Sequence, residues 1–143
     1  MDGSVESIYC NYDGYLEGVG KLLYEDYSNY ERIVKLINLG DILKLNKRLD
    51  NIDNKSNNDV TVAYHRDLGE ELKNNKPLTN KNISELKDSI NDSLIEYIYL
   101  YDEKNKMWLW DYNYFNSDFE LQPLKDALIK EDIIDGEVYD IGI

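Results

Sequence analysis

The chain has 143 residues, a formal net charge of −13, 42% hydrophobic residues and a single cysteine. This length fits one domain of about 100–150 residues, and the lone Cys10 excludes both an intramolecular disulfide and a zinc site built from cysteines. The negative charge disfavours direct binding of nucleic acid or of an anionic membrane, and it favours a basic partner.

The sequence lacks targeting and membrane-spanning signals. Its N-terminus is acidic and has no apolar core segment of the kind that a signal peptide needs. No apolar run approaches the ~20 residues of a membrane span. We therefore expect a cytoplasmic protein.

The charge is concentrated at the two ends of the chain. Residues 1–30 carry six acids against one base, residues 31–101 carry twelve against eleven, and residues 102–143 carry eleven against four. If the fold brings the two ends together they form one anionic face, and if it scatters them the charge serves solubility alone. The 13 tyrosines supply rings that can be half-buried and still offer hydroxyls to a partner.

The first 45 residues predict a strand followed by helices. Alternation over residues 5–10 (VESIYC) favours a strand, and helical spacing begins near Val19. Ser28 or Asn29 can cap a second helix, which Gly40 ends. The apolar residues that follow predict one more short turn of helix: Ile42, Leu43 and Leu45.

The middle of the chain alternates polar stretches with short elements. Residues 46–59 are rich in Asn, Asp and Lys and predict a mobile loop, whereas residues 60–64 (VTVAY) indicate a strand. Asn82 can cap a helix over residues 83–93, with Glu85 at the third helical position as in a capping box.

The strongest local pattern is a hairpin. Residues 95–101 and 107–112 flank a polar four-residue loop, which pairs Asp102 with Met107 and so fixes the whole register. One face is then aromatic and the other aliphatic, and the aromatic face is either core or an exposed binding platform. Its predicted cross-strand pairs are Tyr101 with Trp108, Tyr99 with Trp110, and Tyr97 with Tyr112.

The last segment predicts a helix from Pro123 through Asp132, followed by residues 138–143 (VYDIGI), which can add an edge strand. The element order β-α-α-β-α-β-β-α indicates the α+β class, with helices packed on one face of a mainly antiparallel sheet. We expect a single domain over residues 1–143.

Two motifs suggest chemistry and fall short of it. Residues 14–20 with Lys21 look like a phosphate-binding loop, but the spacing is one residue too long and Leu22 replaces the required hydroxyl. Residues 65–67 (HRD) match part of a kinase catalytic loop without the other kinase elements. His65 is the one candidate general base. We expect no enzyme activity, no catalytic residue, no metal and no cofactor.

Three segments together resemble a group of small phage- and prophage-associated proteins: Ser7-Ile-Tyr-Cys-x-x-Asp13-Gly-Tyr-x-x-Gly18-Val-Gly-x-x-Leu23, Leu39-Gly-Asp-Ile42 and Val62-Ala-Tyr-His-Arg-Asp67. The chain departs from the group's pattern in lacking a strand before its first Asp-Gly turn, and in an acidic C-terminal extension over residues 113–143. The resemblance implies a phage setting. Small acidic proteins from that setting often block host defence by occupying the nucleic-acid site of a defence protein, CRISPR effectors among them.

We therefore expect a non-enzymatic, anti-CRISPR-like inhibitor that acts in the cytoplasm of the host bacterium. It would bind the basic surface of a defence nuclease by mimicking nucleic acid. The residues expected at this surface are acids and tyrosines of the two end segments: Asp13, Tyr15, Glu17, Glu25, Asp26, Tyr112, Tyr114, Asp118, Glu120, Glu131 and Asp132. The alternative is a small-ligand binder that sequesters a nucleotide signal. Its expected ligand-binding residues are Lys21, Tyr64, His65 and Arg66.

Overall fold

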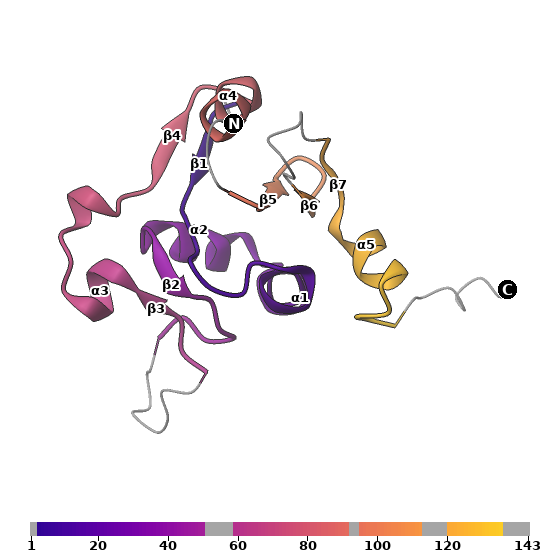
Figure 1. The fold of residues 1–143 in the computed structure, drawn as a ribbon, viewed down its shortest axis with the longest axis horizontal. Coiled ribbons are helices and arrows are strands. Elements are labelled where there is room, and N and C mark those ends of the chain that lie inside the picture. Colours follow the sequence, from indigo (N-terminus) through magenta and orange to yellow (C-terminus); the bar gives the residue numbers. More distant parts are fainter. Residues whose placement is uncertain (1–2, 51–58, 92–94, 113–119, 136–143) are drawn as a thin grey trace, which may run out of the picture.

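A computed structural model describes residues 3–50, 59–91, 95–112 and 120–135 (Figure 1). The fold is α+β, as the sequence predicts, and the named strands pair antiparallel in three small sheets, β1–β4, β2–β3 and β5–β6–β7. The elements in chain order are β1 (Val5–Ser7), η1 (Leu16–Gly20), α1 (Lys21–Asp26), α2 (Tyr30–Asn38), β2 (Ile42–Lys44), β3 (Val62–Ala63), α3 (Tyr64–Leu68), η2 (Leu72–Asn74), β4 (Leu78–Asn80), α4 (Ile83–Asn91), β5 (Tyr97–Asp102), β6 (Met107–Tyr112), β7 (Gln122–Pro123) and α5 (Leu124–Lys130).

The N-terminal helices begin and end near the predicted positions. A π-helical turn, η1, leads directly into α1. Asn29 caps α2, because its side-chain oxygen accepts a hydrogen bond from the backbone N–H of Arg32 at 3.3 Å. Gly40, with φ of 78°, then ends the helical path in the left-handed conformation that glycine adopts without steric cost.

The short helical turn predicted over Ile42, Leu43 and Leu45 is wrong, because Ile42–Lys44 forms strand β2. The left-handed turn at Gly40 redirects the chain, and the backbone N–H of Asp41 donates to Asn75 O at 2.7 Å. Ile42 is thereby aligned with Ala63 of β3 on one side and bridges Cys10 in parallel on the other. Tertiary pairing has overridden a local apolar pattern that fits either structure.

The strand predicted over residues 60–64 is shorter than expected, because Tyr64 begins α3. The carboxylate of Asp67 accepts a hydrogen bond from Ala63 N at 2.7 Å, which stabilises the start of the helix and ends the strand. Strand β4, which the sequence did not predict, pairs with β1, with Ser7 opposite Leu78. Of the predicted mobile loop, residues 51–58 lie outside the described residues.

Helix α4 has the predicted N-terminal cap. Asn82 Oδ1 accepts from Glu85 N at 2.9 Å, and Glu85 Oε1 accepts from Lys81 N at 3.1 Å. Residues 92–94, at the predicted end of this helix, lie outside the described part of the chain.

The hairpin of β5 and β6 has the predicted register, with Asp102 opposite Met107 and Tyr99 opposite Trp110. Both of its faces contact other parts of the protein. The aromatic face packs on a large hydrophobic cluster, and Ile98 on the aliphatic face packs on a small one with Leu86 and Ile90 of α4. The aromatic face is therefore mainly core.

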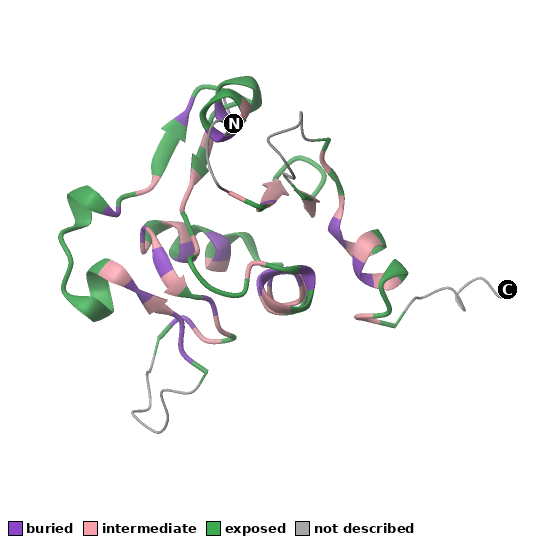
Figure 2. Ribbon diagram, in the orientation of Figure 1, coloured by how far each residue is buried: buried purple, intermediate pink, exposed green. Residues whose placement is uncertain are grey.

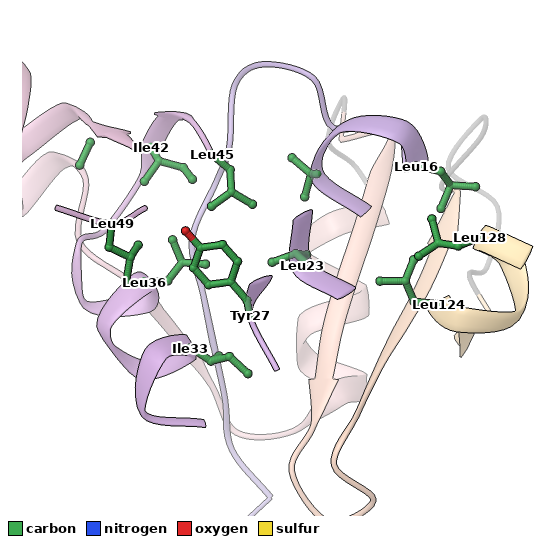
Figure 3. Packing of buried hydrophobic residues seen from close by; sticks show 12 residues of the cluster. Leu16, Leu23, Tyr27, Ile33, Leu36, Ile42, Leu45, Leu49, Leu124 and Leu128 are labelled. Carbon is green, nitrogen blue, oxygen red and sulfur yellow. The ribbon is translucent and has the colours of Figure 1, made fainter. Parts of the chain in front are cut away.

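The large cluster joins segments from both ends of the chain. Leu16 of η1 and Leu23 of α1 share it with Leu124 and Leu128 of α5, as Figure 3 shows. Figure 2 shows the corresponding buried stripes on these elements. Helix α5 follows Pro123 as predicted but ends at Lys130, two residues early. Residues 138–143, the predicted edge strand, lie beyond the described residues.

Candidate protein-interaction surface

The loop over residues 13–20 is closed by its own backbone. Asp13 adopts a φ of 58°, and its carbonyl accepts from Val19 N at 2.9 Å. The carbonyl of Tyr15 accepts from both Gly18 N and Gly20 N. A phosphate-binding loop needs free amide groups that converge on the anion, and here those of residues 18–20 are already bonded within the loop.

The glycines of this loop have structural roles. A Cβ on Gly18 would lie 2.3 Å from Asp13 O, and a Cβ on Gly20 would lie 3.2 Å from the hydroxyl of Tyr99. The same hydroxyl donates to Gly14 O at 2.7 Å. Glycine is therefore required at position 18, where the loop crosses itself, and a larger residue at position 20 would crowd the aromatic face of the hairpin.

The outward side of the loop carries three of the predicted partner-binding residues. Asp13, Tyr15 and Glu17 are all exposed. The Tyr15 hydroxyl donates to Asp13 Oδ1 at 3.1 Å, and this bond together with the negative charge of Asp13 raises the pKa of Tyr15. The loop thus presents a phenol and a carboxylate as one hydrogen-bonded pair.

Two more exposed tyrosines, not among the predicted partner-binding residues, precede this pair. Tyr9, Tyr12 and Tyr15 are 48%, 51% and 44% exposed, and we call them the tyrosine strip. Asn11 N and Tyr12 N donate to carbonyls of β2, which fixes the segment along that strand. The signal available in the sequence was the regular spacing of three residues, in a stretch that begins in the expected strand and runs past its end.

Asp41 anchors the beginning of the tyrosine strip. Its carboxylate accepts from Tyr9 N at 2.9 Å, and its carbonyl accepts from Tyr64 N at 3.2 Å. Partial burial raises the pKa of Asp41, and the bond from Tyr9 N opposes that rise. A Cβ on Gly40 would lie 2.2 Å from Asn75 O, so this junction requires glycine. Segments around Tyr9, Asp41 and Tyr64, far apart in the sequence, therefore meet at one residue.

Tyr64, predicted as a ligand-binding residue, lies beside the tyrosine strip. Loss of solvent is the main cause of its raised pKa, followed by nearby Glu70, Tyr12 and Tyr9. The ring is half-buried at the start of α3. It extends the strip onto a neighbouring element.

The other predicted ligand-binding residues are dispersed. The guanidinium of Arg66 donates to Leu49 O, Thr61 O and the carboxylates of Asp50 and Asp67, all at 2.6–3.1 Å. Through these bonds the guanidinium holds together the chain segments around β3. His65 Nδ1 lies 2.7 Å from Glu70 O, in an exposed position. Lys21 is half-buried on α1, and Figure 1 shows α1 and α3 on opposite sides of β2.

The acidic segments from the two ends of the chain are neighbours. Helix α5 contacts η1, α1 and β6, and all of them share the large cluster. Residues 13–26 and 120–135, which we call the acidic segments, together carry nine acids against three bases. Among the predicted residues there, the acids that are exposed are Asp13, Glu17, Glu25, Glu120, Glu131 and Asp132.

Four predicted residues differ from that pattern or lie elsewhere. Asp26 is half-buried, and its Oδ2 accepts no hydrogen bond from the described residues. Tyr112 is exposed at the end of β6, where its ring lies 5.0 Å from that of Tyr97. Tyr114 and Asp118 lie outside the described residues.

The described residues give little support for metal binding or for reactions of a thiol. Across residues 3–50, 59–91, 95–112 and 120–135, no group of three or more His, Cys, Asp or Glu side chains is placed to hold a metal ion. Burial raises the pKa of the Cys10 thiol to about 11, so the thiolate form that reacts is scarce at neutral pH. None of the helices in the described ranges combines the length and apolar character needed to cross a membrane.

Comparison with known proteins gave no match: no family model, no curated protein and no solved structure is significantly similar to this chain.

Proposed function

We propose that this chain is a non-enzymatic interaction protein whose acidic segments and tyrosine strip bind the basic, nucleic-acid-binding surface of a bacterial defence protein. In this anti-CRISPR-like role, carboxylates would stand where phosphates stand. The tyrosines would supply the hydrophobic anchors that dominate binding energy at many interfaces.

The observation that carries the proposal is the contact between α5 and the η1–α1 segment. It makes neighbours of two segments that hold most of the negative charge of the described chain ends. A concentrated charge of one sign raises the association rate with an oppositely charged surface and disfavours wrong partners. If the negative charge served solubility alone, the acids would not need to lie in neighbouring segments.

The tyrosine strip supplies the second component of an interface. Tyrosine buries a large ring with little loss of rotamer entropy and keeps a hydroxyl for hydrogen bonding. The strip continues into the Asp13–Tyr15 pair, so apolar anchors and carboxylates lie on one continuous stretch of chain.

The alternative, a nucleotide-signal binder built on residues 14–20 with Lys21 and Arg66, has less support. The amides of residues 18–20 are bonded within the loop, and the Arg66 guanidinium is held by three segments of the chain. Neither group is arranged to receive a phosphate.

The test is inhibition of purified CRISPR effectors and other defence nucleases, measured as DNA or RNA cleavage against concentration of this protein. We expect inhibition at low salt that weakens as ionic strength rises, because exposed charge pairs are screened beyond about 10 Å at 0.1 M salt. Nucleic acid and this protein should compete for the same nuclease surface.

Two charge-reversal variants locate the surface. In one, exposed acids of the acidic segments become lysine: Glu17, Glu25, Asp126 and Glu131. In the control, exposed acids of the nearly neutral middle undergo the same change: Glu31, Glu71, Asp88 and Glu96. The first should abolish inhibition and the second should preserve it. Equal loss from both would mean that net charge, and not its location, drives binding, and the proposal would fail.

A further inference from the structure

Three tyrosines and one glutamate gather where the N-terminal segment and α3 lie on either side of Asp41. Tyr9 and Tyr12 are 48% and 51% exposed, Tyr64 is half-buried, and Glu70 is exposed. We call these four residues the tyrosine–glutamate cluster. They come from two segments that lie far apart in the sequence, so the fold creates the grouping.

Backbone hydrogen bonds position the three tyrosines of the cluster. Asp41 bonds to both segments, because its carboxylate accepts from Tyr9 N at 2.9 Å and its carbonyl accepts from Tyr64 N at 3.2 Å. Tyr12 N donates to Leu43 O of β2 at 3.0 Å. The backbone that carries the rings is therefore ordered before any partner binds, which lowers the entropic cost of binding.

Glu70 adds a carboxylate to the rings. A left-handed turn at Gly69, with φ of 75°, reverses the chain after α3, and Glu70 N donates to Tyr64 O at 3.0 Å. After loss of solvent, the charges of Glu70, Tyr12 and Tyr9 raise the pKa of Tyr64, which places the four groups within electrostatic range of one another. Glu70 takes part in none of the ion pairs formed within the described residues.

Exposed aromatic faces beside a carboxylate suit a cation. The face of a tyrosine ring attracts a cation that lies within about 6 Å of the ring centroid. A neighbouring carboxylate then accepts charge-assisted hydrogen bonds from the same cation. The chain itself contains a contact of the first kind, because the guanidinium of Arg32 lies 4.5 Å from the ring centroid of Tyr27.

We infer that the tyrosine–glutamate cluster binds an arginine side chain of the partner, an inference that rests on the proposed function. The planar guanidinium lies over a tyrosine ring while its forked N–H groups donate to Glu70. Arginine suits this arrangement better than lysine, because the guanidinium is weakly hydrated and stacks on aromatic faces, whereas the ammonium of lysine is a compact and strongly hydrated charge. Arginine is also the residue that recognises phosphate at nucleic-acid-binding surfaces. The cluster therefore adds a preference for arginine that the acidic segments, which attract either cation, lack.

Calorimetric titration with two short peptides tests this preference. One peptide contains three arginines separated by Gly-Ser pairs, and in the other each arginine is a lysine, so the charge is the same. We expect the arginine peptide to bind saturably and the lysine peptide to bind about threefold to fivefold more weakly at the same salt concentration. Aromatic NMR resonances of Tyr9 and Tyr12 should shift during the first titration. No saturable binding of the arginine peptide, or equal affinity for both peptides, would overturn the inference.

Two equally exposed tyrosines provide a matched comparison. Tyr12 is 51% exposed and Tyr30, on α2, is 49% exposed. Tyr12→Leu keeps an apolar side chain but removes the ring, so affinity for the arginine peptide should fall about threefold to fivefold. Tyr30→Leu should leave the affinity unchanged, and Tyr12→Phe, which keeps the ring, should retain the preference for arginine. An equal loss in the two leucine variants would rule the cluster out.

The carboxylate is tested with a second matched pair. Glu70→Gln removes the charge but keeps the oxygen that accepts from Asn75 Nδ2 at 3.4 Å. Its affinity for the arginine peptide should fall about threefold or more. Glu96→Gln neutralises another exposed acid and should have a smaller effect. Equal affinities of these two variants would overturn the assignment of Glu70 as the carboxylate that pairs with arginine.

Nuclease inhibition separates this inference from the function on which it rests. Equal affinity for the two peptides together with salt-sensitive inhibition would overturn the inference and support the proposed function, because the acidic segments attract either cation. A clear preference for arginine without inhibition of any nuclease would support the cluster and contradict the proposed function. The side chains changed in these variants are exposed, so the thermal midpoints should stay close to the wild-type value.

Discussion

The two faces of the β5–β6 hairpin are buried in different ways. The aromatic face is tied to the N-terminal region by hydrogen bonds from ring to backbone, Tyr99 Oη to Gly14 O and Trp108 Nε1 to Tyr27 O. The aliphatic face, around Ile98, meets α4 in a cluster with Leu86 and Ile90, where apolar contacts are the interaction. The strand pair thus joins one part of the protein by directional hydrogen bonds and another by apolar contact at Ile98.

The largest difference should appear when one leucine is removed from each cluster. Leu124 is fully buried and lies between the hairpin and the N-terminal helices, whereas Leu86 is 7% exposed at the edge of the small cluster. We expect Leu124→Ala to cost about 4 kcal/mol of unfolding free energy and Leu86→Ala about 2 kcal/mol. Urea denaturation measures both. Equal losses would mean that the two clusters unfold as one equally packed core.

A pair of glycine variants compares how tightly the loop over residues 13–20 closes on itself with how tightly it packs on the aromatic face. Gly18→Ala places a Cβ 2.3 Å from the carbonyl of Asp13, so the backbone must shift, at a cost of about 2–3 kcal/mol. Gly14→Ala meets Tyr97 at 3.5 Å, an ordinary contact. Its thermal midpoint should stay close to the wild-type value, and a similar drop in both variants would contradict this geometry.

Alkaline pH should weaken the large cluster before the small one. Burial raises the pKa of Cys10 from 9.0 to about 11 and raises that of Tyr99, and both side chains pack against the large cluster. A raised pKa stabilises the fold while the group is protonated, so stability is unchanged below about pH 8.5. The shift of Cys10 alone lowers it by roughly 2 kcal/mol by pH 11, and Tyr99 adds to that loss. Urea titrations between pH 8 and 11 measure the loss. The variant Cys10→Ala should show a smaller pH dependence over this range.

Removing one hydroxyl should have the smallest effect. Tyr99→Phe leaves Gly14 O without its donor and should cost about 1 kcal/mol. In Tyr101→Phe the lost hydroxyl makes no hydrogen bond within the described residues, and stability should change little. If the two variants are equally stable, the bond to Gly14 does not contribute to the contrast between the faces.

Local rules were sufficient for the elements that depend on nearby residues. The hairpin register followed from loop length and alternation, and the cap of α4 followed from Asn82 and Glu85. The helical turn expected at Ile42 failed because its strand is set by Gly40 and by a bond to Asn75, more than thirty residues away. Such long-range pairing leaves no local trace in the sequence.

The candidate surface was predictable only in part. The charge at both chain ends was visible in the sequence, but its concentration required the packing of α5 on η1 and α1. Tyr9 and Tyr12 were missed because strand alternation assigns residues to two faces and does not say which face a neighbouring strand leaves open.

The hydrogen bonds that tie the aromatic face to the N-terminal region have a consequence during synthesis. They join residues that are 81 and 85 positions apart in the sequence. At a synthesis rate of about 5–20 residues per second, the N-terminal segment therefore leaves the ribosome roughly 4–17 s before the hairpin residues that it bonds. Helix α1, with six residues, is too short to be stable alone. Leu16, Val19 and Leu23 therefore stay exposed to solvent during this interval. The six acids of the first 30 residues then keep the incomplete chain soluble.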